Sequence, residues 1–291
     1  MATVSRSEPS DIDVLWREEQ YIQPPATFIG QANLVDPAVL DRFTEEHFPE
    51  CFREYADMLT WDRYWHTTLD TSEPPFWKWF VGGTLNACYN CVDRHLAKHK
   101  NKAALIFVPE SEAEPSHALT YQELYVRVNE VAAVLRDVCG LKAGDRVTLH
   151  MPMILELPIT MLACARLGIV HSVVFGGFSG EAAGLRAADS DSRVMVYADA
   201  YYRNGKLIDH KASADIAVQV AANEGQTIEK VLVWRRRDGQ DLSNTPMVPG
   251  GPASFMVNNH QWAVYGAIAA AVGIDQVVWS NTRSKANAKS L

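Results

Sequence analysis

Short apolar runs alternate with amphipathic segments along the middle of the chain, between about residues 84 and 236. Four of these runs carry no regularly spaced polar face: RVTLHM (146–151), IVHSVVF (169–175), VMVYAD (194–199) and KVLVWR (230–235). Strands buried on both sides of a parallel sheet have this composition, because helices cover each face. The alternation predicts an α/β fold, namely a doubly wound and mainly parallel sheet with flanking helices.

The most clearly marked helix covers about residues 120–140, ahead of the first of these strands. Thr120 and Glu123 have the spacing of a capping box, in which each side chain bonds the backbone N–H of the other residue. Leucine and valine then recur at helical spacing, and Gly140 marks the end. The apolar run AALIFV (103–108) before this helix is predicted as a further strand.

Both ends of the chain lack this alternation. Residues 1–83 are rich in aromatic and acidic side chains, and we expect them to wrap a neighbouring core as helices and irregular chain. Residues 249–291 continue no strand–helix rhythm and end in a basic, polar stretch that we expect to be partly disordered. The predicted organisation is an N-terminal segment (1–83), an α/β subdomain (84–248) and a tail (249–291).

The composition and the absence of targeting signals favour a protein of the cytoplasm. The chain has 27 basic against 35 acidic residues, which does not favour a nucleic-acid-binding surface. The N-terminus lacks a secretory signal, and the apolar run WAVYGAIAAAVG (262–273) is too short to span a membrane. We therefore expect the 5 cysteines to be reduced thiols in a cytoplasmic protein without a membrane partner.

Cys88 and Cys91 form a CxxC pair within a predicted helix over residues 84–99, and His95 and His99 follow at four-residue spacing. Side chains four apart share one helix face, so Cys91 and the two histidines could hold a metal ion. No second CxxC pair and no HExxH motif accompanies them, and histidines on a helix face are more often solvated. The structural interpretation is favoured, and no metal site is predicted.

Gly176 and Gly177 follow the predicted strand 169–175 and precede a predicted short helix. Ligands of doubly wound sheets bind beyond the carboxyl ends of the strands, where a strand gives way to a helix N-terminus. The sequence there, FGGFSG, is neither a P-loop nor the GxGxxG fingerprint of dinucleotide-binding proteins. A ligand-binding turn and a simple change of chain direction are both compatible with these residues.

Beyond the next predicted strand, Arg203 and Lys206 flank the dipeptide Asn204-Gly205. The Asn-Gly sequence favours a tight turn, which would present the two cations together. Two cations beside a glycine turn could clamp a phosphate group. Two solvated loop charges are the alternative interpretation.

Three stretches of the sequence together resemble one known family. They are WFVGGTLNACYNCVDRHL (79–96), the segment from LTYQELYVRV to VYAD (119–199) and YYRNGKLIDHK (201–211). The chain is similar to acetyl-coenzyme A synthetases, the acetate–CoA ligases of the AMP-forming acyl-adenylate superfamily, from about Ile12 to about Val248. The resemblance implies that coenzyme A, Mg-ATP and acetate or another short acid are substrates of the complete protein, with none bound tightly. Such enzymes form an acyl-adenylate and pyrophosphate, and the coenzyme A thiol then displaces AMP.

The resemblance also implies roles for individual residues of this chain. The second glycine of the family's FGG turn and the cations of its R-x-G-[RK] loop contact the nucleotide end of coenzyme A. In this sequence those positions are Gly177, Arg203 and Lys206. Three further residues would shape the two turns: Gly176, Asn204 and Gly205. The glycine would admit the ligand closely, and the two cations would oppose its 3′-phosphate.

The sequence departs from the family's pattern after about residue 249. The loop rich in Thr, Ser and Gly that holds the ATP phosphates, the acid-pocket tryptophan and the adenylation lysine have no counterpart, so no catalytic residue is predicted. We therefore expect a truncated ligase that is inactive alone, from a frameshift or an incorrect gene model, and whose exposed core favours self-association. The alternative is a non-enzymatic module that binds coenzyme A or a protein partner. A nicotinamide-dependent oxidoreductase would fit the sheet but needs the missing fingerprint.

Overall fold

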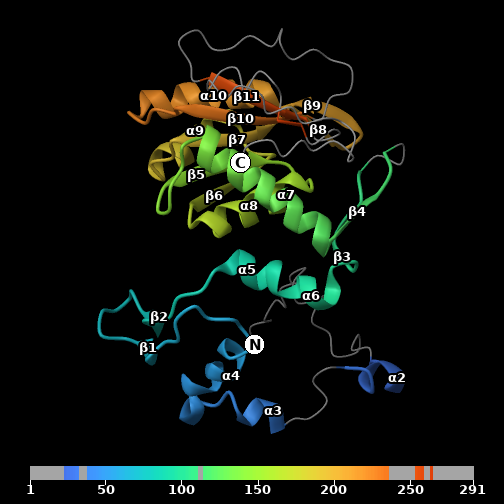
Figure 1. The fold of residues 1–291 in the computed structure, drawn as a ribbon, viewed down its shortest axis with the longest axis vertical. Helices are drawn as coiled ribbons and strands as arrows, with labels where there is room; N and C mark the ends of the chain where they lie inside the picture. Colours follow the sequence, from blue (N-terminus) through green and yellow to red (C-terminus); the bar gives the residue numbers. More distant parts are fainter. Residues whose placement is uncertain (1–22, 33–37, 111–113, 236–252, 259–262, 265–291) are drawn as a thin grey trace, which may run out of the picture. The chain divides into compact units, whose positions relative to one another are not determined.

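The computed structural model of the chain describes residues 23–32, 38–110, 114–235, 253–258 and 263–264 (Figure 1). The chain divides into two compact units. One unit lies within residues 1–59 and 64–83, and the other within residues 60–63 and 84–291. Each unit has its own β-sheet.

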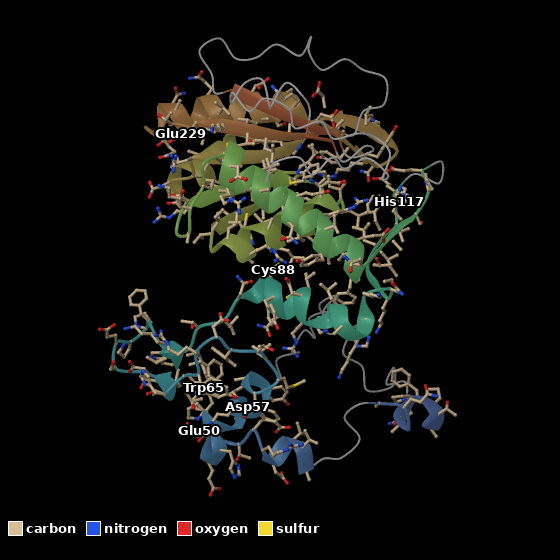
Figure 2. The ribbon with its side chains drawn as sticks, in the orientation of Figure 1. Glu50, Asp57, Trp65, Cys88, His117 and Glu229 are labelled. Carbon is tan, nitrogen blue, oxygen red and sulfur yellow. The ribbon has the colours of Figure 1, made fainter. Side chains whose placement is uncertain are left out.

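The N-terminal unit contains short helices, one two-stranded sheet and a cluster of aromatic rings. Its elements are α2 (Ala26–Ile29), α3 (Ala38–Asp41), α4 (Arg53–Ala56), two 3₁₀ turns (Glu45–His47 and Glu50–Phe52) and the antiparallel strands β1 (Thr67–Asp70) and β2 (Lys78–Val81). Phe48 and Phe52 each meet the Trp79 ring edge-to-face, with ring centres 5.9 and 5.3 Å apart. Trp65, labelled in Figure 2, is buried against the Phe80 ring. These aromatic contacts stabilise the unit, since edge-to-face pairs are a favoured geometry.

The second unit is built around a six-stranded sheet. Its strands are β5 (Arg146–Met151), β6 (Val170–Phe175), β7 (Val194–Ala198), β10 (Lys230–Arg235), β11 (Ala253–Asn258) and β12 (Ala263–Val264). They lie in the order β12–β11–β10–β7–β5–β6, and every neighbouring pair is parallel except β11 and β12. Because β6 adds to one side of β5 and β7 to the other, the direction of winding reverses at β5.

Helices cover both faces of this sheet, which confirms the predicted doubly wound α/β fold (Figure 1). The helices are α7 (Tyr121–Ala133), α8 (Glu156–Leu167), α9 (Gly180–Asp189) and α10 (His210–Asn223). Along β7, Val194 and Val196 belong to the core that contains α7 and α8. Met195 and Tyr197, between and after them, belong to the core that contains α9 and α10. Successive strand residues point to opposite faces, so one strand serves both cores.

The helix that leads into the sheet begins at the predicted capping box. The Thr120 hydroxyl accepts from the Glu123 N–H at 3.2 Å, and the Glu123 carboxylate accepts from the Thr120 N–H at 3.0 Å. A cap of this kind stabilises a helix by about 1 kcal/mol. Beyond α7 a π-helical turn (Val134–Val138) leads to Gly140, whose φ of 68° explains the glycine at the predicted end.

The strand predicted over residues 103–108 is confirmed as β3 (Ala103–Phe107), which pairs antiparallel with β4 (His117–Thr120) outside the large sheet. One expectation about the tail and one about a helix were wrong. The tail was expected to contain no further part of the strand–helix pattern, but β11 adds a parallel strand beside β10. The helix expected over residues 84–99 is broken into α5 (Ala87–Cys91) and α6 (Leu96–His99), since Val92 leaves the helical conformation with φ −126° and ψ −66°.

The rest of the predicted tail, including its basic end, lies outside the described residues. Within the described ranges, no helix combines the length and the apolar character that crossing a bilayer requires.

Candidate functional site

A cavity of about 310 Å³ lies beyond the carboxyl ends of β5, β6 and β7. Its walls include the segments that follow these strands, at residues 152–154, 175–177 and 201–203. The remaining lining residues come from the end of β3 and its connection to β4: Phe107, Val108, Glu110 and Glu114. In open α/β sheets, ligands bind at the carboxyl ends of the strands where the winding reverses. The cavity therefore lies where this fold favours a ligand.

The two glycines after β6 lie where an added β-carbon would collide with neighbouring atoms. A β-carbon on Gly176 would lie 2.9 Å from the backbone nitrogen of Pro152, on the segment that follows β5. A β-carbon on Gly177 would collide with the Arg203 guanidinium and would lie 2.7 Å from the Phe175 ring. Real β-carbons essentially never approach other atoms this closely, so a side chain at Gly176 would force the backbone of Pro152 to shift, and one at Gly177 would displace the side chains of Arg203 and Phe175. The turn is thus a place of close approach rather than a simple change of chain direction.

The predicted Asn-Gly turn forms the tip of a β-hairpin. Strands β8 (Ala200–Arg203) and β9 (Lys206–Asp209) pair antiparallel, with Arg203 directly opposite Lys206. Asn204 and Gly205 have φ values of 52° and 71°, as two-residue turns of the primed type require. The turn therefore presents two cations side by side. Among the described residues, neither cation makes an ion pair with a carboxylate.

The predicted site residues come together to different extents. Gly176, Gly177 and Arg203 line the cavity, and the Arg203 guanidinium lies 5.9 Å from the centre of the Phe175 ring. Lys206 reaches the site only through its pairing with Arg203, because it is not among the residues that line the cavity. Asn204 and Gly205 shape the hairpin tip, as expected.

Tyr201 ties the hairpin to the glycine turn, and the sequence analysis missed it. Its hydroxyl donates to the Gly176 carbonyl at 3.0 Å, although the two residues belong to different strand–loop segments. The Tyr201 ring is buried and meets the His210 ring edge-to-face, with ring centres 5.2 Å apart. A buried hydroxyl bonded to a backbone carbonyl fixes the relative position of the two segments.

A pair of buried histidines lies beneath Tyr201, and its hydrogen bonds determine the tautomers. The Ala198 carbonyl, 3.1 Å from His210 Nδ1, can only accept, so His210 carries its proton on Nδ1. His210 Nε2 is then the acceptor, and His150 Nε2–H donates to it over 3.3 Å. His150 Nδ1 is buried, and the His150 ring also interacts with the backbone of Phe175, Gly176 and Phe178.

The surroundings of the pair keep both rings uncharged. Burial lowers the pKa of His150 and that of His210 to about 4, well below the ordinary value of 6.5. A positive charge on His210 would lower the pKa of His150 further. At neutral pH the pair is therefore a neutral, enclosed support for Tyr201. No sequence signal predicts it, because only the packing of β5 against the start of α10 brings the two histidines together.

One carboxylate reaches the hairpin from the connection between β3 and β4. The Gly205 N–H donates to Glu110 Oε1 at 2.7 Å. Glu110 also lines the cavity, so a negative charge stands next to the cationic turn. The sequence analysis missed this residue too, since nothing in its local sequence indicates a partner in a distant hairpin.

The CxxC pair and the histidines after it do not form a metal site in the described part of the chain. No group of three cysteine, histidine or carboxylate side chains there is placed to hold a metal ion. Cys88 is buried, and its burial raises the pKa of the thiol, whereas Cys91 is exposed. The helix break at Val92 separates Cys91 from the helical register of the histidines, and His95 Nε2 bonds the Asn90 carbonyl at 3.0 Å.

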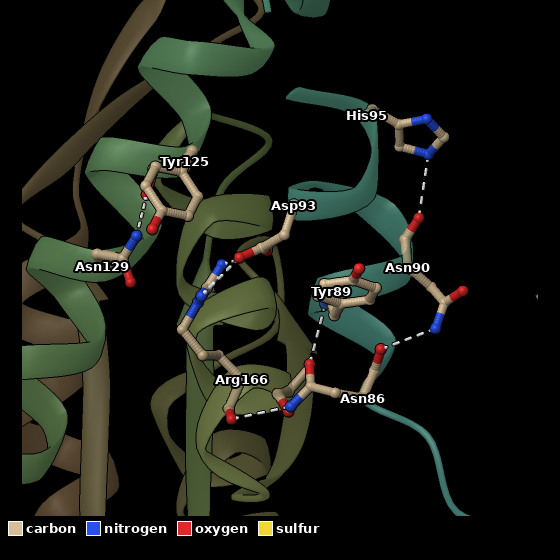
Figure 3. Close-up of polar contacts among 9 residues, drawn as sticks. Asn86, Tyr89, Asn90, Asp93, His95, Tyr125, Asn129 and Arg166 are labelled. Atoms are coloured by element: carbon tan, nitrogen blue, oxygen red, sulfur yellow. Dashed lines mark hydrogen bonds and ion pairs between the residues drawn. The ribbon is translucent and has the colours of Figure 1, made fainter. Parts of the chain in front are cut away.

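Polar contacts fasten the segment around α5 to α8, as Figure 3 shows. Arg166 on α8 donates two hydrogen bonds to the Asp93 carboxylate, at 2.6 and 3.1 Å. Asn86 donates to the Arg166 carbonyl at 3.0 Å and accepts from the Tyr89 N–H at 3.0 Å. The Arg166 guanidinium also lies 5.4 Å from the centre of the Tyr125 ring on α7. These residues join the segment around α5 to the rest of the second unit.

The fold and the cavity define an α/β protein with a candidate anion-binding site at the reversal point of its sheet. Two family models match the chain: "AMP-binding enzyme" over residues 92–255 and "Acetyl-coenzyme A synthetase N-terminus" over residues 40–91. The first covers more than half of the chain, and the chain belongs to the family of AMP-binding enzymes.

Individual relatives agree with this assignment. An acetyl-coenzyme A synthetase of Streptomyces coelicolor is 44% identical over 234 residues, which are 79% of this chain and 34% of that protein. An acetyl-coenzyme A synthetase of Mycobacterium bovis is 45% identical over 227 residues, covering 75% of this chain and 34% of that protein. A 3-hydroxypropionyl-coenzyme A synthetase of Sulfurisphaera tokodaii is 46% identical over 193 residues, covering 64% and 29%. The chain thus spans about a third of the length of the curated relatives it matches.

Proposed function

We propose that this chain carries the coenzyme A-facing part of an AMP-forming acid–CoA ligase. The cavity receives the nucleotide end of coenzyme A, with Gly177, Arg203 and Lys206 as the contact residues. The observation that carries this proposal is the placement of the Arg203 guanidinium beside Gly177 in one cavity at the reversal point of the sheet. A glycine admits close approach of the ligand, and a guanidinium offers a planar pair of donors to a phosphate.

The hairpin supplies the charge that a phosphate monoester needs. Arg203 and Lys206 are paired across the turn and are without carboxylate partners in ion pairs among the described residues. Their charges would be neutralised by the 3′-phosphate of coenzyme A, which carries close to two negative charges at neutral pH. Hydrogen bonds between ionised groups are roughly twice as strong as neutral ones.

The proposed reaction of the complete protein has two steps. A short-chain carboxylate attacks the α-phosphate of Mg-ATP, forming an acyl-adenylate and releasing pyrophosphate. The thiol of coenzyme A then attacks the acyl carbon and displaces AMP. The names of the relatives include both acetyl- and 3-hydroxypropionyl-coenzyme A synthetases, so the acid is proposed as a short one, with acetate first. Within this chain only the recognition of coenzyme A is assigned to residues.

We further propose that this 291-residue chain does not catalyse the adenylation by itself. It spans about a third of the relatives' length, and no residue of it is assigned to ATP. The test is acetate-dependent release of pyrophosphate by the purified chain. A background rate is expected, and turnover at about 1 per second or faster would contradict this part of the proposal.

A non-enzymatic coenzyme A-binding module is a second candidate, because the described lining of the cavity already includes the Arg203 cation beside Gly177. Both functions include binding of coenzyme A, so binding alone does not distinguish them. Only the ligase is expected to turn over acetate. Binding by this chain, together with acetate-dependent turnover when the missing length of a relative is supplied as a fusion, favours the ligase. Binding without turnover in that fusion favours the module.

We also propose that the isolated chain acts in the cytoplasm and associates with itself. Val170, Val173 and Phe175 on the edge strand β6 are exposed, and an uncovered apolar edge favours association. Gel filtration at several concentrations tests this, and a monomer at all of them would contradict self-association.

A further inference from the structure

The Glu110 carboxylate lies on a backbone N–H group that a bound phosphate would use. That group is the Gly205 N–H, which donates to Glu110 Oε1 at 2.7 Å. It projects from the turn between Arg203 and Lys206, the two cations that are paired across the hairpin. Backbone N–H groups of turns attract anions, and flanking cations strengthen that attraction. Glu110 therefore stands where an anion is expected to bind.

The same residue belongs to the wall of the cavity. Glu110 lines it together with Arg203 and Gly177, so its charge is felt by any ligand that enters. A carboxylate and a phosphate that compete for one donor repel each other. When a phosphate binds beside Arg203, Glu110 either leaves the Gly205 N–H or weakens the binding.

We infer that Glu110 is an internal competitor for the phosphate position and that it sets how strongly the cavity discriminates between phosphate-bearing and phosphate-free ligands. In the free protein the carboxylate satisfies the turn and holds the hairpin tip in place. A ligand gains the full attraction of the turn only after displacing this carboxylate. The inference rests on the proposed recognition of coenzyme A, and it adds a specificity-determining residue that opposes binding.

The test uses the full chain and two variants that lose the same charge. Glu110→Gln keeps the shape of the side chain and removes its negative charge. Glu224→Gln, at the end of α10 and outside the residues that line the cavity, is the matched control. Titration calorimetry measures the affinity of each protein for coenzyme A and for dephospho-coenzyme A.

Glu110→Gln is expected to bind coenzyme A about fivefold more tightly, with less than about a twofold change for dephospho-coenzyme A. The control should change neither affinity by more than about twofold. Unchanged or weaker coenzyme A binding by Glu110→Gln, beside measurable binding by the unaltered chain, overturns the inference alone. Absence of binding by all three proteins overturns the proposed function and the inference with it.

A second measurement reports the contact without any ligand. Nitrogen–proton correlation spectra of the labelled chain follow the amide resonance of Gly205. Replacing a carboxylate acceptor by a neutral amide should move this resonance in Glu110→Gln and leave it in place in Glu224→Gln. A Gly205 resonance that is the same in all three proteins contradicts the inference, whatever the calorimetry gives.

Discussion

The Arg203 guanidinium occupies the space that a β-carbon on Gly177 would fill. The two residues follow different strands, β7 and β6, and they meet only because these strands lie on either side of β5. This relationship joins the glycine turn and the cationic hairpin into one site. Some of the residues around it contact the cavity, and others support the fold.

Alanine substitutions at the two glycines should have different effects. Gly177→Ala meets a side chain, so Arg203 is displaced, and affinity for coenzyme A should fall about tenfold with little loss of stability. Gly176→Ala meets the backbone of Pro152, which cannot move freely, so the free energy of unfolding should fall by about 1–3 kcal/mol. Calorimetry and chemical denaturation measure the two effects.

Gly30→Ala is a suitable control for this pair, because the added β-carbon comes no closer than 3.4 Å to other atoms. It should change neither quantity appreciably. Equal losses of stability in Gly176→Ala and Gly177→Ala would contradict the distinction.

Tyr201→Phe removes the hydroxyl that bonds the Gly176 carbonyl and leaves the ring in place. The free energy of unfolding should fall by about 1 kcal/mol, and affinity for coenzyme A should fall as the turn loses its position. Tyr202→Phe is the control, since Tyr202 also lines the cavity but is exposed. If both variants change stability equally, the hydroxyl of Tyr201 does not hold the turn.

Acid should destabilise the protein through the buried histidine pair. The pKa of His150 and that of His210 are lowered from 6.5 to about 4 in the folded state. Between these pH values the unfolded chain therefore binds more protons than the folded chain. The stability contributed by neutral histidines is complete above about pH 6.5, and it is lost as the pH falls from there towards 4. The expected slope is about 1.4 kcal/mol per pH unit for each proton taken up. His171, whose pKa burial also lowers, contributes with the same sign.

Denaturation at several pH values measures this slope. His150→Leu should reduce it, because one of the titrating groups is gone. His99→Gln is the control, since His99 is exposed on α6. A slope between pH 6.5 and 4 that is identical in the unaltered chain and in His150→Leu would show that the pair does not control acid stability.

Breaking the ion pair between Arg166 and Asp93 should affect stability without affecting the site. The side chains are 20% and 18% exposed, and Arg166→Gln would leave a largely buried carboxylate without its partner. The free energy of unfolding should fall by about 2–3 kcal/mol. In the exposed pair of Arg136 and Asp137, Arg136→Gln should cost less than about 0.5 kcal/mol. If Arg166→Gln lowers the free energy of unfolding less than Arg136→Gln does, the pair of Arg166 and Asp93 does not stabilise the fold.

The sequence predicts those features whose cause is local. The capping box of Thr120 and Glu123, the Asn204-Gly205 turn and the buried strands all form as expected, because short-range geometry decides them. The run 103–108 is correctly predicted as a strand, but its composition cannot tell which partner the strand takes, and it pairs with β4. β11 was missed because the tail sequence shows no repeated alternation of apolar runs and amphipathic segments around it.

The contacts that complete the site depend on topology instead. Tyr201 reaches Gly176, and Glu110 reaches Gly205, only after β5, β6 and β7 have assembled. The meeting of His150 with His210 likewise needs α10 in place on the sheet. No spacing rule within one segment predicts contacts between segments, so sequence reasoning finds the two turns and not the residues that join them.

The central claim is that the cavity recognises the 3′-phosphate of coenzyme A through Arg203. Titration calorimetry of the unaltered chain with coenzyme A and with dephospho-coenzyme A tests this most directly, with Arg203→Gln in parallel. The unaltered chain should prefer coenzyme A by about tenfold or more, and the preference should largely disappear in Arg203→Gln. Equal affinity of the unaltered chain for the two ligands, or a preference that survives in Arg203→Gln, would contradict the claim.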